Sequence, residues 1–295
     1  MISICIPVYN YQVVKLINSL IIQINKLNEK FEIIVIDDGS NDKCIKDNAS
    51  ISNMDKVHYI TLKDNVGRSK IRNLFLEKAT FEHLLFIDCD CSIPSKNYLS
   101  NYINYIHQDV VYGGRKHRKN QPEDISLKLR WKYGVKIEDQ SFKYRLKNPY
   151  HSFKSNNFLI RKSIFSKIRF NENITSYGHE DTQLSLELKK NKIKILQIDN
   201  VVYHDGIENN KVFLKKSHEA IKNLLKIEKL IEDSSGIKLV NSYKKITKLK
   251  LEKVLSIMYK PLRKILEKQL LSNWPSIKIF SLYKLLIYIK EKENV

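Results

Sequence analysis

Four short apolar runs in the first part of the chain constrain its fold most, because a cluster of polar residues follows each of them. The runs are rich in Ile, Val, Phe and Tyr and mostly do not alternate with polar residues, which is typical of strands covered on both faces. They read ISICIPV (2–8), FEIIVID (31–37), VHYITL (57–62) and HLLFID (83–88). Segments with helical spacing of apolar residues, such as 11–30 and 67–79, lie between them. This alternation predicts a parallel α/β sheet with right-handed connections.

The polar clusters are expected to meet at one edge of that sheet. In a parallel sheet the carboxyl ends of the strands lie together, and such folds bind ligands there. The clusters are PVYN (7–10), DDGS (37–40), KDNVGRS (63–69) and DCD (88–90). The sequence therefore predicts a ligand-binding cleft lined by them.

The last of these clusters predicts a metal site. In an extended chain, Asp88 and Asp90 point to the same side while Cys89 points into the core. Two carboxylates on one side suit Mg²⁺ or Mn²⁺, which keep other positions for phosphate oxygens and water. The alternative is an acidic pair that merely opens a loop. The preceding buried strand and the neighbouring polar clusters favour the metal.

Two further clusters predict contacts with a nucleotide. Asp37 and Asp38 form either a capped turn or an acceptor for a base or ribose. Gly67 allows a close backbone approach, and Arg68 and Arg72 are one helical turn apart. Arginine binds a diphosphate through forked hydrogen bonds, and a helix N-terminus adds a favourable dipole. A solvated basic helix face is the alternative.

Charge is unevenly distributed along the 295 residues, whose net charge is +20. The segment 211–295 alone holds 20 Lys and Arg against 8 Asp and Glu. A basic surface favours nucleic acid, anionic lipid or phosphorylated substrates. An overall abundance of lysine explains the same numbers without any such partner.

The cysteines and the apolar segments bear on location. The four cysteines show no CxxC spacing, so free thiols in a reducing compartment are expected. The N-terminus lacks the pattern of a signal peptide, and no run reaches the ~20 apolar residues of a spanning helix. We expect a cytoplasmic protein, at most peripheral on the inner face of the membrane.

Taken together, ISICIPVYN, EIIVIDDGSND, NVGRSKIRN and LLFIDCD resemble family 2 glycosyltransferases of the GT-A fold. The resemblance covers residues 1–95 and again 153–206. It implies a Rossmann-like, mostly parallel sheet, a nucleotide-sugar donor that is usually a UDP-sugar, and Mn²⁺ or Mg²⁺. The resemblance implies that Pro7 and Tyr9 contact the nucleotide and that Asp38 binds the base. It also implies that Arg72 contacts the ribose or the phosphates. Asp90 would bind the metal, and Asp88 would lie beside it on the sugar–ribose side.

The second half adds candidates for catalysis. Gly178 to Asp181, in SYGHEDTQLSLEL, resembles the Gly-x-Glu-Asp segment of chondroitin-polymerase-like and β-galactosyltransferase-like enzymes. A sugar hydroxyl needs a base to take its proton as the new bond forms. The resemblance implies Asp181 as base and Glu180 as the group that orients the acceptor, with the reverse assignment open. Stabilisation of a helix N-terminus is the alternative role. The resemblance also implies that His204 is a metal ligand.

These observations lead to a domain plan and a predicted activity. A catalytic domain is expected over 1–210, with a nucleotide-sugar-binding half (1–95) and an acceptor-binding half (96–210). A basic helical region is expected over 211–295, with a break at SSG (234–236). The resemblance implies inverting transfer of a hexosyl or N-acetylhexosaminyl group to a saccharide or lipid-linked glycan, as in polysaccharide synthesis.

The sequence also leaves two possible roles for the C-terminal helices and bears on two alternatives to this activity. The helices either pack on the catalytic domain or a second subunit, or lie on an anionic membrane. A nucleotidyltransferase that makes nucleotide sugars requires a Gly-rich loop after the first strand, where the chain has IPVYNYQ. A nucleic-acid-binding protein would place DDGS, DCD and HED against phosphates, which they repel without a metal. We therefore expect no nucleic-acid partner.

Overall fold

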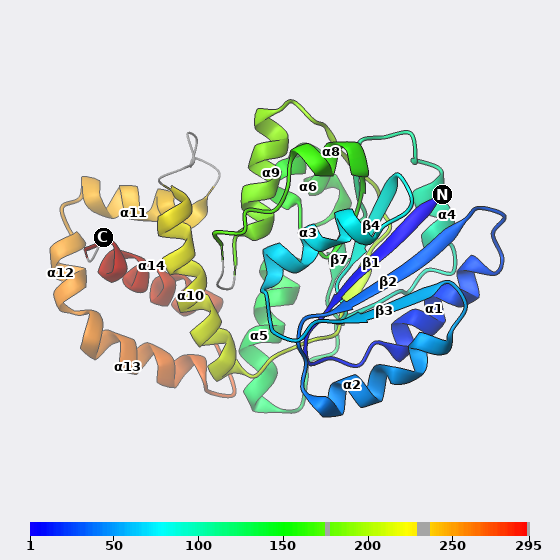
Figure 1. The fold of residues 1–295 in the computed structure, drawn as a ribbon. Helices are drawn as coiled ribbons and strands as arrows, with labels where there is room; N and C mark the ends of the chain where they lie inside the picture. Colours follow the sequence, from blue (N-terminus) through cyan, green and yellow to red (C-terminus); the bar gives the residue numbers. More distant parts are fainter. Residues whose placement is uncertain (175–177, 229–236, 294–295) are drawn as a thin grey trace. The chain divides into compact units, whose positions relative to one another are not determined.

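The computed structural model describes residues 1–174, 178–228 and 237–293, and within them the chain forms two compact units (Figure 1). Unit 1 comprises residues 1–117, 139–175 and 180–206, and unit 2 comprises 118–138, 176–179 and 207–295. The predicted break at 234–236 lies outside the described residues.

A seven-stranded sheet forms the centre of unit 1, in the order β3-β2-β1-β4-β8-β6-β9. β4 and β6 pair antiparallel with β8, and the other neighbours pair parallel. Its strands are β1 (Ile2–Val8), β2 (Phe31–Asp37), β3 (Val57–Thr61), β4 (His83–Ile87), β6 (Val110–Tyr112), β8 (Asn157–Arg161) and β9 (Ile195–Gln197). The predicted mostly parallel α/β fold is confirmed.

Helices cover both faces of this sheet, which explains why its strands are apolar without alternation (Figure 1). Ile4 and Ile6 of β1 pack with α1 and α4, whereas Cys5 packs on the opposite face with α3 and α9. The helices of unit 1 are α1 (Val14–Ile24), α2 (Asp42–Asn48), α3 (Arg68–Lys78), α4 (Tyr98–Ile103), α6 (Phe142–Lys147), α7 (Pro149–Ser152), α8 (Lys162–Lys167) and α9 (Glu180–Lys190), with a 3₁₀ turn at Ala49–Asn53.

A second, three-stranded sheet lies in the same unit, in the order β5-β10-β7. It consists of β5 (Cys91–Ser92), β10 (Val202–His204) and β7 (Arg115–Lys116). β10 pairs antiparallel with β5, so that His204 lies opposite Cys91. The sheet therefore joins the segment after β4 to a strand more than a hundred residues later.

The apolar pattern of IKILQIDNVVYHDG (193–206) predicts one strand ending at His204, but the structure contains two. β9 ends at Gln197 and joins the large sheet, whereas β10 starts at Val202 and joins the small one. The buried Asn200 holds the crossing between them, because its Nδ2 donates to the Tyr98 carbonyl over 2.9 Å.

Unit 2 is helical, which confirms the predicted helical C-terminal appendage. Its elements are η2 (Ile125–Leu127), α5 (Lys128–Tyr133), a π-helical turn (Gly134–Glu138), α10 (Asn210–Glu228), α11 (Lys238–Lys248), α12 (Glu252–Ile257), α13 (Tyr259–Leu270) and α14 (Ile277–Glu293). Residues 118–138 are predicted to belong to the catalytic domain. In the structure they group with the C-terminal helices, because Tyr133 packs on Phe213 and Phe280. None of the described helices is long and apolar enough to cross a membrane.

Candidate active site

The acidic pair at the end of β2 holds two loops at the carboxyl edge of the sheet. Asp37 accepts a hydrogen bond from the Ser40 backbone over 2.7 Å, as expected of a capped turn. Asp38 is 4% exposed and accepts the backbone N–H groups of Val66 and Gly67, over 2.7 and 3.1 Å. These bonds fix the chain that leads into α3. Both carboxylates thus have structural partners, and base binding by Asp38 remains a prediction.

α3 starts at this loop and carries two arginines into the site. Gly67 has φ of 89°, a conformation that side chains with a Cβ rarely adopt. Arg72 is buried, and its Nη2 donates to Asp88 Oδ1 over 2.5 Å. Arg68 Nε donates to Glu180 Oε1 over 2.6 Å, and its Nη2 lies 3.8 Å from Asp88 Oδ2. Arg68 therefore lies between Asp88 and Glu180, the first residue of α9.

Asp88 and Asp90 are predicted to lie in an extended strand, but the structure places them in a turn. β4 ends at Ile87, and the Cys91 backbone donates to the Asp88 carbonyl over 3.2 Å, which closes a turn. As a result Asp88 pairs with the arginines of α3, whereas Asp90 contacts His204. Cys89 packs partly buried against the core, as predicted.

Asp90 and His204 form the closest pair of candidate metal ligands. His204 Nε2 lies 3.1 Å from Asp90 Oδ2, and the buried Nδ1 has no hydrogen-bond partner in the described part of the chain. The Asp205 backbone donates to the Asp90 carbonyl over 2.8 Å. A Cβ on Gly206 would lie 2.4 Å from Asp90 Oδ2. Gly206 was not predicted, although it follows the predicted ligand His204 by two positions.

Electrostatics keep Asp90 ionised. Burial by itself raises the pKa of Asp90, but the charge and hydrogen bond of His204, together with Arg68 and Arg115, lower it to about 2. An ionised carboxylate is the form that binds a metal ion. The Asp90 side chain is 25% exposed, so it retains access to solvent and to ligands.

A second histidine lies beside His204 and was not predicted. The rings of His117 and His204 are 5.2 Å apart between centroids. His117 is buried, and its Nδ1 lies 2.6 Å from Asp139 Oδ1. A carboxylate in this position orients an imidazole ring. The sequence offered no signal for this pair, because the two residues are 22 positions apart in a segment without a recognised motif.

The predicted catalytic pair at the start of α9 separates into two ion pairs. Glu180 is 5% exposed and binds Arg68, whereas Asp181 Oδ2 lies 3.0 Å from Lys154 Nζ. Burial lowers the pKa of Lys154, but the attraction of Asp181 outweighs it and the pKa is raised. Lys154 was not predicted, because a single lysine among aromatic residues carries no sequence signal.

The arrangement fits a divalent cation with few protein ligands. No three His, Cys, Asp or Glu side chains form a metal-binding group in the ranges that the structure describes. Asp88, one of the predicted ligands, is instead paired with Arg72. Asp90 and His204 remain, with a carboxylate oxygen and the ring nitrogen Nε2 that lie 3.1 Å apart. Mg²⁺ and Mn²⁺ accept so small a set when substrate phosphates and water complete it.

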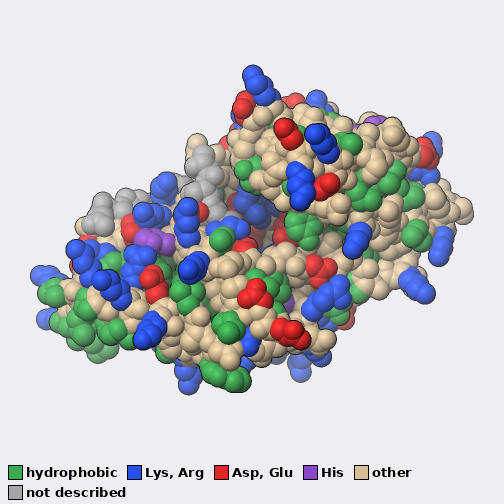
Figure 2. Space-filling view, turned by 90° about the horizontal axis from the view of Figure 1, so that it is seen from below, with side chains coloured by type: hydrophobic (Ala, Val, Ile, Leu, Met, Phe, Trp, Pro, Cys, Tyr) green, Lys and Arg blue, Asp and Glu red, His purple; other side chains and the backbone are tan. Residues whose placement is uncertain are grey.

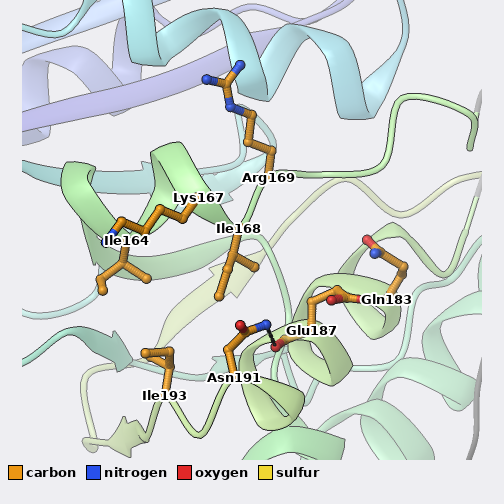
Figure 3. A pocket seen from close by; sticks show the side chains of 8 residues that line it. All are labelled: Ile164, Lys167, Ile168, Arg169, Gln183, Glu187, Asn191 and Ile193. Atoms are coloured by element: carbon orange, nitrogen blue, oxygen red, sulfur yellow. Dashed lines mark hydrogen bonds between the residues drawn. The ribbon is translucent and has the colours of Figure 1, made fainter.

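The remaining predicted nucleotide-binding residues lie at the carboxyl end of β1, where the Tyr9 backbone contacts Cys89. Pro7 is buried within β1, opposite Ile36, whereas Tyr9 is 53% exposed just beyond the strand. A pocket of about 390 Å³ lies between α8 and α9, and Figure 3 shows its lining side chains. None of the predicted site residues lines it.

Solved structures with a similar fold are glycosyltransferases. A mannosyltransferase from Pyrobaculum calidifontis, in complex with GDP-Man and Mn²⁺, matches with a TM-score of 0.62 and 13% identity over 99% of this chain and 86% of its own. S. aureus TarS 1-349 in complex with UDP-GlcNAc matches with a TM-score of 0.53 and 18% identity, over 99% and 91%. At such identities the likeness concerns the fold alone.

Sequence relatives point to the same family. An uncharacterized glycosyltransferase of Haemophilus influenzae is 34% identical over 37% of this chain and 43% of its own length. A chondroitin synthase of Pasteurella multocida is 24% identical over 63% of this chain and 22% of its own. The chain thus spans less than half the length of these relatives. The sequence profile of glycosyl transferase family 2 matches residues 3–169. The chain belongs to glycosyl transferase family 2 and has the GT-A fold, as the sequence motifs predict.

Proposed function

We propose that this protein transfers a sugar, with inversion, from a UDP-sugar or a related nucleotide sugar to a saccharide or lipid-linked glycan. The observation that carries the proposal is the Asp90–His204 pair at the carboxyl edge of the sheet, with Arg68 and Arg72 on the adjoining helix. This set provides oxygen and nitrogen ligands for a cation and positive charge for phosphates.

In this proposal Asp90 and His204 hold Mn²⁺ or Mg²⁺. The cation, when bound, neutralises charge on the leaving nucleoside diphosphate. Arg68 contributes positive charge at the same place, since its side chain is 44% exposed while it contacts Glu180. Arg72 acts through Asp88, because its guanidinium is buried and bonded to that carboxylate. Asp88 is thereby fixed beside the sugar–ribose side of the donor.

The acceptor side rests on α9. We assign Asp181 as the base that takes the proton from the acceptor hydroxyl as the glycosidic bond forms. Glu180 is less suited to this role, because its side chain is 6% exposed against 16% for Asp181, and Arg68 lowers its pKa despite the opposing effect of burial. Lys154 holds Asp181 from the other side. Inversion requires attack on the face opposite the diphosphate, which one base accomplishes without a second catalytic carboxylate.

A thermal-unfolding panel of UDP- and GDP-sugars, each with and without Mn²⁺, tests the donor site. A ligand at about a hundred times its Kd stabilises the folded state by about 2.7 kcal/mol, which raises Tm by about 5 °C in a chain of this size. We expect at least one nucleotide sugar to give this rise, and the rise to depend on Mn²⁺.

The Asp90→Asn variant should lose the Mn²⁺-dependent part of the rise. Asp55→Asn serves as the matched control, because the Asp55 side chain is 90% exposed in unit 1. Release of nucleoside diphosphate in the presence of oligosaccharide acceptors measures turnover of the same variants. A flat panel, or an Mn²⁺-dependent rise that survives Asp90→Asn, would overturn the assignment.

A further inference from the structure

Helices α12 and α13 in unit 2 have an inner and an outer apolar face. The inner face contributes to the helical core with α14. It consists of Leu255, Tyr259, Leu262, Leu266 and Leu270. Burial of this face accounts for the folding of the two helices. It does not account for the apolar residues on their other side.

The outer face forms an exposed apolar stripe. Its members recur at helical spacing within each helix, three positions apart in α12 and four positions apart in α13, with one member at the junction between them. They are Val254, Ile257, Met258, Pro261 and Ile265. Ile257 is 81% exposed and Ile265 is 65% exposed. Single exposed apolar residues are ordinary, but a row of them marks a surface that contacts something.

Lysines surround this stripe. The segment 244–270 contains nine Lys and Arg against two glutamates, and Glu267 is engaged by Arg263 over 2.7 Å. The exposed lysines beside the stripe are Lys248, Lys250, Lys253, Lys260, Lys264 and Lys268. Figure 2 shows apolar and basic side chains mixed over the part of its surface that the C-terminal helices form. We name Val254, Ile257, Met258, Pro261, Ile265 and these lysines the α12–α13 face.

We propose that the α12–α13 face docks on an anionic lipid bilayer. A helix face with aliphatic side chains between lysines fits the boundary between headgroups and acyl chains, where the lysines meet lipid phosphates. A second copy of the chain fits less well, because a symmetric pair would bring two lysine-rich faces together. Nucleic acid fits less well too, because the stripe holds no aromatic side chain on which bases stack. The inference does not depend on the proposed catalytic function.

Co-sedimentation of the full chain with vesicles tests the proposal. We expect binding to vesicles of phosphatidylcholine and phosphatidylglycerol in equal parts, weaker binding to phosphatidylcholine alone, and a decrease with salt. Replacing Lys253, Lys260 and Lys264 by Gln should reduce binding about a hundredfold, since each basic residue near such a surface contributes about fivefold. Ile257→Asp combined with Ile265→Asp should also abolish binding. Both residues are exposed, so the fold remains intact.

Matched substitutions on unit 1 control for charge and polarity. Lys26, Lys30 and Lys43 are exposed, and their replacement by Gln changes the net charge equally. Ile22→Asp changes an isoleucine of α1 that is 59% exposed. These controls should bind vesicles like the parent chain, and circular dichroism should show all variants folded. Equal loss in controls and test variants overturns the proposal, as does equal binding to neutral vesicles. Sedimentation of a dimer that Ile257→Asp dissociates would assign the face to a second copy instead.

Discussion

Replacing Arg72 by methionine is expected to lower the free energy of unfolding by about 3 kcal/mol, at the lower end for a broken buried ion pair. Arg72 is 2% exposed, and its Nη2 and Nη1 donate to Asp88 over 2.5 Å and to the Arg68 carbonyl over 2.9 Å. Methionine keeps most of the apolar part of the arginine side chain. In the parent chain, the guanidinium of Arg72 lies 5.7 Å from the centroid of the Phe170 ring. The cost therefore comes mainly from Asp88, which is 17% exposed and would lose its nearest cation.

A double-mutant cycle isolates this interaction. Asp88→Asn alone leaves the Arg72 guanidinium buried without its carboxylate and should cost a similar amount. The double variant removes both charges, so it should cost about 2 kcal/mol less than the two single variants added together. Urea titrations followed by circular dichroism provide the free energies. Single costs that add to within about 0.5 kcal/mol would refute the reasoning, because they would show that the two charges do not interact.

Three further predictions concern the rest of the site. Asp181→Asn should lower nucleoside diphosphate release by about 10²- to 10⁴-fold and leave the donor-induced rise in Tm unchanged; loss of both would contradict its role as a base. Gly206→Ala should weaken Mn²⁺ binding by about 10- to 100-fold, because the added Cβ would meet Asp90 Oδ2, and Mn²⁺ titrations by electron paramagnetic resonance check this. Burial raises the pKa of Glu180, but Arg68 outweighs burial and lowers it. The stability that this ion pair contributes is therefore complete above the ordinary carboxyl pKa of about 4.3, and it is lost as the pH falls through the lowered pKa. Unfolding free energies between neutral and acid pH should therefore fall less steeply in Arg68→Met than in the parent chain, and parallel curves would count against the pair.

The parts of the fold that the sequence predicts best are those with a single local cause. β1 and β2 begin and end at the predicted residues, because helices on both faces require an unbroken apolar run and polar residues end it. The split of 193–206 into two strands was not predictable in this way. Both strands are apolar, and the break depends on Asn200, whose side chain bonds to Tyr98 about a hundred positions away.

The candidate site, like the fold, was predictable only in part. The motifs predict which residues gather at the sheet edge, because the parallel topology fixes where strands end. They do not predict how these residues pair. Asp88 binds Arg72 and Asp90 contacts His204 only because the chain turns after Ile87, and no periodicity indicates that turn. Lys154 reaches Asp181 across 27 positions, a partner that only the folded chain reveals.

The pairing of β5 with β10 has a consequence for how such a protein diversifies. His204 lies opposite Cys91, next to Asp90, so the spacing of the two candidate ligands depends on the register of two short strands. The chain between those strands supplies β6, β8 and β9 of the large sheet and β7 of the small one, so most of it cannot change without disturbing the packing that sets this spacing. Residues 118–138 group with unit 2 instead, so we expect relatives to differ there more readily than in the strands that set the spacing of the two candidate ligands.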